Sequence, residues 1–389
     1  MKYSVACCLL THNHPDIVKE ILDRCLDIYS DHGVDICIYD DSGDCSTKEL
    51  IADYISDGAL NLYYVDICNA INGDHKLYLL LQGYGLPKEY DYIWPCKDRI
   101  CFGASYMDRL CASIDEGHDV VIGYNENTRW DVGVKVLQNI YTDPVEFYRL
   151  YAAASTDWEC LIRRRETMLA PIEWEKYEKK YGVGAECNFN QSITLFVRLS
   201  EMNACSIKIC RYLYDERFIS RNDKSSWGNI MFQLWIDKWV SANYSLPSIY
   251  DRYKAEAIKA ETNLTALFGS VENFIHYKEA GLFDIEVFKR YRDIWEYITE
   301  IPPEYLLMIA NGDYSTAINA TINDFEKCFL IHDFRKAWWI VTSNSFFKTV
   351  YNERTYGLLV MYFNKYRNDM MQYGISSVFD GVNSIQDLR

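Results

Sequence analysis

The first 44 residues alternate between short apolar runs and polar turns, and this order constrains the fold. Residues 3–10 form an apolar run that ends in the turn 11–15, and an amphipathic stretch follows over residues 16–29. A second apolar run, 34–39, ends in the acidic turn 40–44. Strand, helix and strand in this order predict a parallel sheet whose strands end at one edge. Since such sheets bind ligands beyond the carboxyl ends of their strands, both turns are candidate nucleotide-binding segments, although neither contains a glycine-rich phosphate motif.

The same alternation continues along the chain. Strands are predicted over residues 60–65, 90–94, 120–122 and near 158–163, and helices over 47–56, 77–82 and 104–115. From residue 250 the pattern is helical, with helices predicted over 284–298, 338–350 and 356–371. We therefore predict an α/β domain, residues 1–240, with a mostly parallel sheet and helices on both faces. An all-helical domain, residues 241–389, follows it.

Composition narrows the classes of partner. The chain has 389 residues, a formal net charge of −16 and no basic run, which argues against nucleic acid and anionic membrane surfaces as partners. No apolar stretch reaches the ~20 residues that a membrane-spanning helix needs. The 14 cysteines form no Cys-x-x-Cys pair, and no secretion signal precedes the first strand. We therefore expect reduced thiols and a cytoplasmic protein.

The two polar turns also carry a resemblance. Leu10-Thr11-His12-Asn13-His14-Pro15, followed by Tyr39-Asp40-Asp41-Ser42-Gly43-Asp44, resembles family 2 glycosyltransferases of the glycosyltransferase A fold. The usual pattern of that family is Thr-x-Asn-Arg-Pro and then Asp-Asp-x-Ser-x-Asp. The match covers the α/β domain and is best in its first half. It implies a bacterial enzyme that transfers a sugar from a nucleotide sugar, most often a uridine diphosphate (UDP) sugar.

The resemblance implies roles for the acidic turn. Asp40 would accept a hydrogen bond from the uracil ring and Asp41 would bind the ribose, because a fixed carboxylate gives a directional, charge-assisted bond. The alternative is a turn that caps the following helix, as Asp44 and Ser46 also could do.

The first turn and a downstream lysine complete the implied nucleotide site. Thr11 and Asn13 belong to the turn, and His12 would pack against the base unless it is a hydrogen-bonded turn residue. Lys76 stands where the family places a basic residue that reaches the nucleotide; at the start of a helix its charge is unfavourable, and a bound phosphate would reverse that cost. Asp74 is expected to pair with Lys76 or to cap the helix.

The next motif departs from the family. There a strand of this kind ends in Asp-x-Asp, which holds Mn²⁺ or Mg²⁺; here Asp98 stands between Lys97 and Arg99. Two adjacent cations would repel a divalent ion, which needs well-placed carboxylates. We therefore expect a metal-independent transferase in which Lys97 and Arg99 neutralise the departing diphosphate, while Asp98 binds ribose or donor sugar. Two alternatives stay open: one Mn²⁺ or Mg²⁺ on Asp98, or a site that binds without catalysis.

An inverting transferase also needs a base that takes the proton of the acceptor hydroxyl. The family often supplies it from a Glu-Asp pair, which is absent here. Asp157, beside Trp158, is the favoured candidate and Glu186 the second; a solvated loop acid is the alternative for each. The run 163–165 of three arginines is expected to be solvated, and residues 225–227 are a candidate lid.

Three functions compete at this point. The first is an inverting glycosyltransferase that uses a UDP sugar and extends a glycan on a protein or polysaccharide, with a helical domain that binds the acceptor or forms a homo-oligomer. The second is a non-catalytic subunit that keeps the fold and binds a partner. The third, a nucleotidyltransferase with a related sheet, would need a glycine-rich loop with a lysine after the first strand, which residues 11–16 lack.

Overall fold

The computed structural model describes residues 1–67, 70, 72–98, 100–125, 139–168, 173–212, 217–219, 230–264, 268–331, 333, 336, 337, 340 and 344. Internal contacts divide the chain into two compact units, and the division along the chain falls after Ile258. The sequence places its domain boundary at residue 240, so the segment up to residue 258 belongs by its contacts with the α/β part. Each unit is described here by itself.

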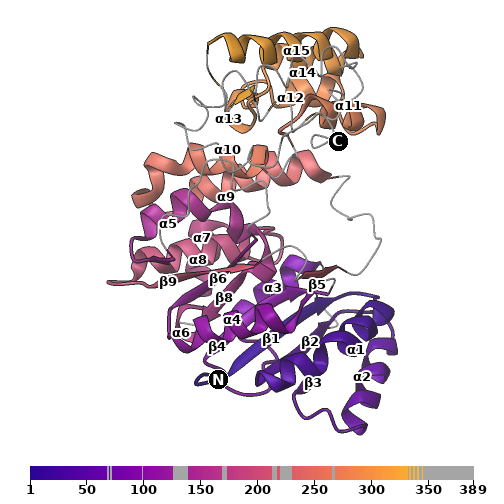
Figure 1. Ribbon diagram of the computed structural model, residues 1–389, viewed down its shortest axis with the longest axis vertical. Coiled ribbons are helices and arrows are strands. Elements are labelled where there is room, and N and C mark those ends of the chain that lie inside the picture. Colours follow the sequence, from indigo (N-terminus) through magenta and orange to yellow (C-terminus); the bar gives the residue numbers. More distant parts are fainter. Residues whose placement is uncertain are drawn as a thin grey trace, which may run out of the picture. The chain divides into compact units, whose positions relative to one another are not determined.

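The first unit is built on a mixed sheet (Figure 1). Its strands are β1 (Val5–Thr11), β2 (Val34–Asp40), β3 (Leu62–Asp66), β4 (Tyr92–Lys97), β6 (Val120–Asn125), β7 (Ile140–Tyr141), β8 (Leu161–Arg164) and β9 (Ile207–Tyr212). They lie in the order β3-β2-β1-β4-β8-β6-β9-β7. The pairs β3/β2, β2/β1, β1/β4 and β6/β9 are parallel, whereas β8 and β7 run antiparallel to their neighbours. Two further strands, β5 (Ile100–Phe102) and β10 (Arg217–Ile219), form an antiparallel pair.

Helices cover both faces of this sheet, because alternate side chains of each buried strand point to opposite sides. Val5, Cys7 and Leu9 of β1 join one core cluster with α1 (Pro15–Asp31), α2 (Ser46–Ser56) and α4 (Ala104–Asp115). Ala6, Cys8 and Leu10 join a second cluster with α3 (Gly73–Leu81) and Met168. The predicted α/β class with a mostly parallel sheet is confirmed.

The remaining helices of this unit follow the sheet's second half. They are α5 (Pro144–Tyr151), α6 (Arg165–Met168), α7 (Trp174–Tyr181), α8 (Asn190–Glu201) and α9 (Trp239–Ser245), with short 3₁₀ helices η2 (Ala153–Thr156) and η3 (Trp158–Cys160). The sequence predicts one strand near residues 158–163; the structure has η3 there, followed by β8. A fully buried hydrogen bond of 2.7 Å from Tyr148 of α5 to Asn243 Oδ1 of α9 joins two of these helices.

The strand order opens the sheet beside the end of β4. β8 pairs with β4 only at Tyr92 and Ile93. Pro95 therefore lies beyond this pairing, where its missing N–H interrupts no ladder on that side. Because β8 is antiparallel to β4, the residues that precede β8 lie beside the carboxyl end of β4, and η3 contacts β4 there. This topology brings residue 157 to the edge where the parallel strands end.

The second unit is helical, as the sequence predicts. After α10 (Lys254–Leu264), which leads into it, its described elements are α11 (Val271–Glu279), α12 (Ile285–Arg290), α13 (Trp295–Ile298), α14 (Pro303–Ala310) and α15 (Tyr314–Leu330). The side chain of Trp295 is fully buried, and its ring contacts those of Phe274, Phe283, Phe288 and Tyr291.

One helix prediction in this unit is wrong. Residues 284–298 form two helices, α12 and α13, rather than one. Trp295 Nε1 donates to the carbonyl of Phe288 at 2.9 Å, and the N–H of Arg292 turns to Lys289. The indole thus takes the acceptor that a continuing helix would use, while the apolar face is kept. The predicted helix 356–371, and nearly all of 338–350, lie outside the described residues.

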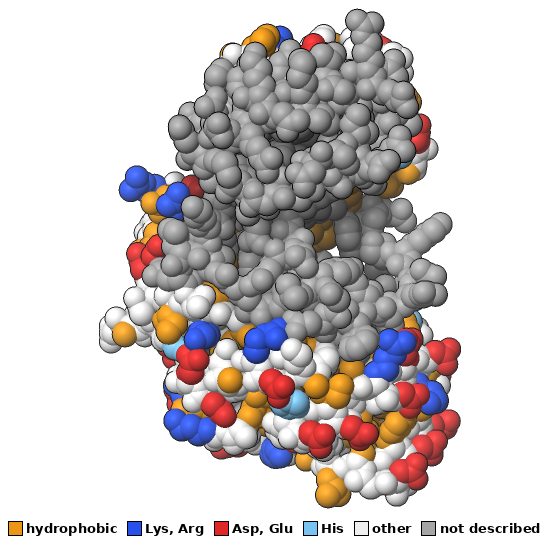
Figure 2. Space-filling view, viewed as in Figure 1, with side chains coloured by type: hydrophobic (Ala, Val, Ile, Leu, Met, Phe, Trp, Pro, Cys, Tyr) orange, Lys and Arg blue, Asp and Glu red, His pale blue; other side chains and the backbone are white. Residues whose placement is uncertain are grey.

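The surface agrees with the acidic composition. On the face drawn in Figure 2, acidic and basic side chains of the described residues are interspersed. No helix in the described part of the chain is both long and apolar enough to cross a bilayer.

Candidate functional site

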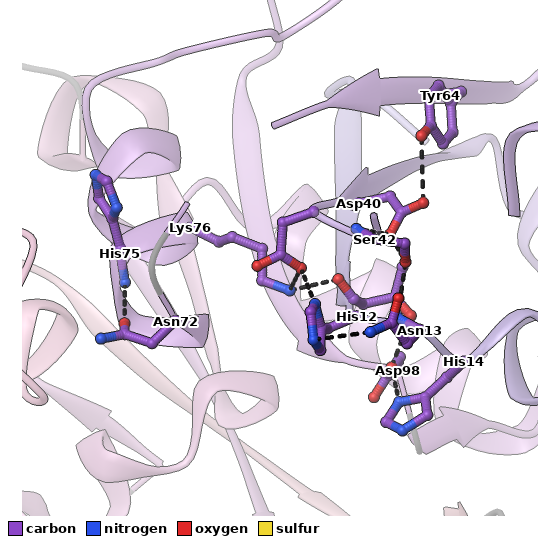
Figure 3. Close-up of polar contacts among 12 residues, drawn as sticks. His12, Asn13, His14, Asp40, Ser42, Tyr64, Asn72, His75, Lys76 and Asp98 are labelled. Carbon is purple, nitrogen blue, oxygen red and sulfur yellow. Dashed lines mark hydrogen bonds and ion pairs between the residues drawn. The ribbon is translucent and has the colours of Figure 1, made fainter. Parts of the chain in front are cut away.

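The carboxyl ends of three neighbouring parallel strands meet at one edge of the sheet. The register pairs Thr11 of β1 with Asp40 of β2, and Leu10 with Lys97 of β4. Polar residues that follow these strands are therefore brought together, with Lys76 of α3 beside them (Figure 3). We call this group the strand-end network: Thr11, His12, Asn13, His14, Asp40, Asp41, Ser42, Lys76 and Asp98.

A buried ion pair joins two strands to α3. Lys76 Nζ lies 2.7 Å from Asp41 Oδ1 and also donates to the carbonyl of Thr11, and the side chains of Lys76 and Asp41 are only 3% and 5% exposed. His12 Nδ1 lies 3.0 Å from the same Asp41 oxygen, and its own side chain is 60% exposed. Asn13 Nδ2 lies 3.0 Å from His12 Nε2, so a histidine that donates to Asp41 can accept from Asn13. Lys76 thus fixes the turn, and His12 presents its ring to solvent.

Asp98 is held by the first turn. Thr11 Oγ1 donates to Asp98 Oδ2 at 2.7 Å, and His14 Nδ1 lies 3.0 Å from the same oxygen. The turn can bend in this way because Asn13 adopts a left-handed conformation, with φ of 55°; asparagine tolerates that region better than most residues. The N–H of Asn13 donates to Ser42 Oγ at 2.7 Å, which ties the first turn to the acidic turn.

Asp40 is almost fully buried and is engaged within the protein. Its Oδ1 accepts the N–H of Ser42 at 2.9 Å and the Ser42 hydroxyl, and its Oδ2 accepts the hydroxyl of Tyr64 at 3.2 Å (Figure 3). Burial and the Asp40 charge raise the pKa of Tyr64, so its hydroxyl remains a donor. Asp44, by contrast, binds Ser46 before α2, as the capping alternative predicts for that residue.

Lys97 and Asp157 form a second pair at this edge. Lys97 Nζ lies 2.8 Å from Asp157 Oδ1, and both side chains are somewhat more than a third exposed. The favoured base candidate is thus paired with one of the two cations assigned to the diphosphate. Arg99, the other cation, lies outside the described residues, as do residues 225–227.

Asp74 neither pairs with Lys76 nor caps α3. The cap is Asn72, whose side chain accepts the N–H of His75 at 2.8 Å. Asp74 is half-buried; its Oδ2 accepts from Asn188 Nδ2 at 3.2 Å, and its buried Oδ1 finds no hydrogen-bond partner among the described residues. Burial raises the pKa of the Asp74 carboxyl to about 7, against smaller opposing effects of the Asn188 hydrogen bond and the Lys97 charge.

Two other predictions fall elsewhere. Glu186 is exposed and lines a cavity beside α8, and no printed contact joins it to the strand-end network. The expectation that residues 163–165 are solvated is wrong for Arg163, which is fully buried and donates to Thr194 Oγ1 and the carbonyl of Thr167. β8 is an inner strand of the sheet, so both of its faces are covered. Burial lowers the pKa of the Arg163 guanidinium to about 9.

The described residues do not fit the divalent ion that the resemblance implies. Among them, no group of three or more histidine, cysteine or acidic side chains could hold a metal. Asp98 supplies one carboxylate, and its Oδ2 already accepts from Thr11 and faces His14. A hard divalent cation takes several oxygen ligands, so we derive no step through a metal.

Sequence reasoning missed Ser42, Tyr64 and Asn188 as partners of the site's carboxylates. Ser42 stands two residues after Asp40, the spacing of a local Asx turn, and that signal was available. Tyr64 lies near the end of β3, so its place at the same sheet edge could also have been expected. Nothing in the sequence indicates that Asn188 approaches α3.

Comparisons with known proteins place this geometry in context. No protein-family model matches the chain, and neither does a curated protein. The solved structure of S. aureus TarS 1-349 in complex with UDP-GlcNAc is similar, with a TM-score of 0.47 and 12% identity over 83% of this chain and 91% of that one. The mannosyltransferase PcManGT from Pyrobaculum calidifontis, in complex with GDP-Man and Mn²⁺, gives 0.42 and 13% over 80% and 87%.

A third similar structure is glucosyl-3-phosphoglycerate synthase from Mycobacterium tuberculosis, in complex with Mn²⁺, UDP and glucosyl-3-phosphoglycerate. Its TM-score is 0.38, with 13% identity over 63% of this chain and 81% of that one. These proteins are glycosyltransferases or a glucosyl-bearing synthase, the kind of protein that the sequence motifs predict. At TM-scores under 0.5 they give this chain no donor, acceptor or metal.

Proposed function

We propose that this chain is a glycosyltransferase that moves a sugar from a UDP sugar to a hydroxyl group of a glycan, on a protein or a polysaccharide, with inversion. One observation carries the proposal: the polar residues at the carboxyl ends of β1, β2 and β4 form a connected network at a single edge. Open α/β sheets bind nucleotides at such an edge. The motif resemblance assigns the same residues to a nucleotide sugar.

The nucleoside would lie on the first two strand ends. The exposed ring of His12 offers a face for uracil, and Asp40 and Asp41 supply carboxylates for the base and ribose, with Thr11 and Asn13 shaping the turn. These carboxylates are already fixed by Lys76, Ser42 and Tyr64. Such fixed groups bind without the entropic cost of ordering them.

The diphosphate would lie at the end of β4. Lys97 is partly exposed beside Asp98, and Arg99 follows in the sequence. Transfer breaks the bond between the sugar and the diphosphate, so negative charge grows on the leaving phosphate oxygens. Positioned cations stabilise that charge, which supports transfer without a metal.

The acceptor side is less constrained. The sequence assigns acceptor binding or homo-oligomer formation to the helical region from residue 241, and we keep both as proposals. α9, at the start of that region, packs within the first unit. A glycoprotein or polysaccharide acceptor that is modified in the cytoplasm accords with the acidic, cysteine-rich composition.

The test starts from binding. UDP is expected to raise the melting temperature of the chain more than UMP or GDP does, with and without a chelator. One of a panel of UDP sugars is then expected to be consumed in the presence of chelator, and Arg99→Ala to abolish that turnover. If no uridine nucleotide shifts the melting temperature, the proposal fails.

The alternative, a non-catalytic subunit, has one supporting observation: Asp40 and Asp98 already have partners within the protein. The same assay separates the two functions. Nucleotide binding with no consumption of any UDP sugar, with or without Mn²⁺, would favour the binding subunit over the enzyme.

A further inference from the structure

A cavity of about 710 Å³ lies beside α8, within the first unit. Its volume is in the range of small-molecule sites. Aromatic rings and polar groups share its wall, an arrangement that suits the apolar faces and hydroxyl edges of a sugar. The residues that carry this argument are Tyr78, Tyr181, Phe189, Glu186, Asn188 and Lys238.

Asp74 adjoins this cavity through two of its wall residues. Asn188 donates to Asp74 Oδ2 at 3.2 Å, and the Asp74 charge acts on the neighbouring thiol of Cys187. The other Asp74 oxygen is buried without a partner among the described residues. A buried polar atom left in this way costs stability, so its presence needs a reason.

Asp74 also adjoins the strand end on its other side. The first turn of α3 packs on the ring of Trp158, so closely that a Cβ on Gly73 would come within 3.0 Å of it. Trp158 follows Asp157, which pairs with Lys97 at the end of β4. The Lys97 charge acts on Asp74 directly.

The N-terminus of α8 fixes these segments together. Asn190 Nδ2 donates to the carbonyl of Asp74 at 3.4 Å, and Ser192 Oγ donates to the carbonyl of Ser155 at 3.0 Å. Three segments therefore meet at Asp74: the start of α3, the residues before β8, and the start of α8. The cavity lies on one side of this junction and the cations of the strand end on the other.

We propose that the cavity beside α8 holds the acceptor sugar and that Asp74 takes the proton of its attacking hydroxyl. The inference rests on the proposed transferase function and names the base that it requires. The acceptor oxygen forms a bond to the anomeric carbon as the bond from that carbon to the diphosphate breaks. The electron pair of the broken bond leaves with UDP, and the hydroxyl proton passes to the Asp74 carboxylate.

The other two carboxylates suit this role less well. Asp157 is engaged by Lys97, and Glu186 is exposed on the cavity wall, away from the strand end. Among the described residues, the charged and titratable groups that act on Asp74 are Lys97 and the Cys187 thiol. Burial raises the pKa of Cys187 to about 11, so it stays neutral, and an acid–base transition near neutral pH belongs to Asp74.

The experiment separates donor binding from proton transfer. Wild type, Asp74→Asn, Glu186→Gln and Asp16→Asn are compared in UDP affinity by calorimetry and in the hydrolysis of UDP sugars between pH 5.5 and 8.5, with water as the acceptor. Asp16→Asn is the matched control, because Asp16 occupies the same second position of α1 that Asp74 occupies in α3 and is exposed.

Asp74→Asn is expected to bind UDP as wild type does, to lose about 10²- to 10⁴-fold in turnover, and to lose the rise of rate with pH near 7. Asp16→Asn should keep both. If Asp74→Asn stays within threefold of wild type, or if Glu186→Gln alone removes the pH dependence, the assignment of Asp74 is overturned. Absence of UDP binding or turnover in wild type would instead overturn the proposed function.

The cavity has its own test. In the presence of UDP, saturation-transfer NMR with a panel of methyl pyranosides is expected to show a bound sugar in wild type. Ser241→Trp, which places a large ring on the cavity wall, should remove the signal while UDP affinity is kept. No bound pyranoside in wild type, or an unchanged signal in the variant, would overturn the assignment of the cavity.

Discussion

The environment of Asp74 predicts how stability depends on pH, whatever the chain does. The folded state raises the pKa of this carboxyl from 3.8 to about 7, so the folded chain binds more protons than the unfolded chain between these values. Stability contributed by the protonated form is fully present below pH 3.8 and is lost as the pH rises through 7. Asp74→Asn removes the ionisation but keeps the shape and an acceptor for Asn188.

The magnitude follows from the pKa. At about 1.36 kcal/mol per pKa unit, the rise corresponds to about 4 kcal/mol, an upper bound because the residue is half-buried and water reaches it. About 2 kcal/mol of this is lost between pH 5.5 and 7, a range that stays above the pI of about 4.9. We therefore expect the free energy of unfolding of Asp74→Asn to exceed that of wild type by about 2 kcal/mol more at pH 8.5 than at pH 5.5.

The assay is urea unfolding, followed by tryptophan fluorescence, at several pH values. Asp16→Asn controls for the loss of an acid at the second helical position, which costs about 0.3–1 kcal/mol through the helix dipole and should not vary in this way with pH. If the Asp74→Asn and wild-type curves run parallel from pH 5.5 to 8.5, the carboxyl is not desolvated as described, and its role as a base loses its physical support.

Three further predictions concern the same unit, each checked by urea unfolding. Lys76→Met should cost about 3–5 kcal/mol because it leaves Asp41 charged and buried, whereas Lys88→Met, which removes the half-exposed pair with Asp35, should cost under about 1 kcal/mol; equal losses would contradict this. Gly85→Ala should destabilise more than Gly33→Ala by about 1–3 kcal/mol, since both have positive φ but only at Gly85 would the new Cβ approach Val65 Cγ1 to 2.3 Å; the reverse order would refute the reasoning. Tyr148→Phe should cost about 1–3 kcal/mol through the unpaired Asn243 oxygen, and a neutral effect would show that this bond adds nothing.

The first half of the sheet could be predicted from sequence because its signals are local. Apolar runs of strand length alternate with amphipathic stretches, and each turn carries residues that stop a strand or cap a helix. The strand ends were displaced by only a few residues: β4 extends to Lys97 although Pro95 lies inside it. That proline is tolerated because β8 leaves β4 beyond Ile93, a fact of topology that no local pattern contains.

The site was predictable as a location but not as a set of contacts. Both turns and Asp98 lie at one edge because parallel strands share their direction. The pairing of Lys97 with Asp157 depends on β8 running antiparallel, since a parallel β8 would carry residue 157 to the opposite edge. The pairing of Lys76 with Asp41, rather than with the adjacent Asp74, depends on which face of α3 meets the sheet.

The distribution of partners among the carboxylates argues for a division of labour. Asp40, Asp41, Asp98 and Asp157 each accept a hydrogen bond or an ion pair from a named donor at the edge. In the described part of the chain, Asp74 alone has a buried carboxylate oxygen with no partner. Carboxylates that are held by donors serve to fix a ligand, since moving their protons would break the fold's own contacts. A carboxylate with an unused oxygen can take up a proton without such a loss, and that difference separates the group suited to proton transfer from those suited to binding.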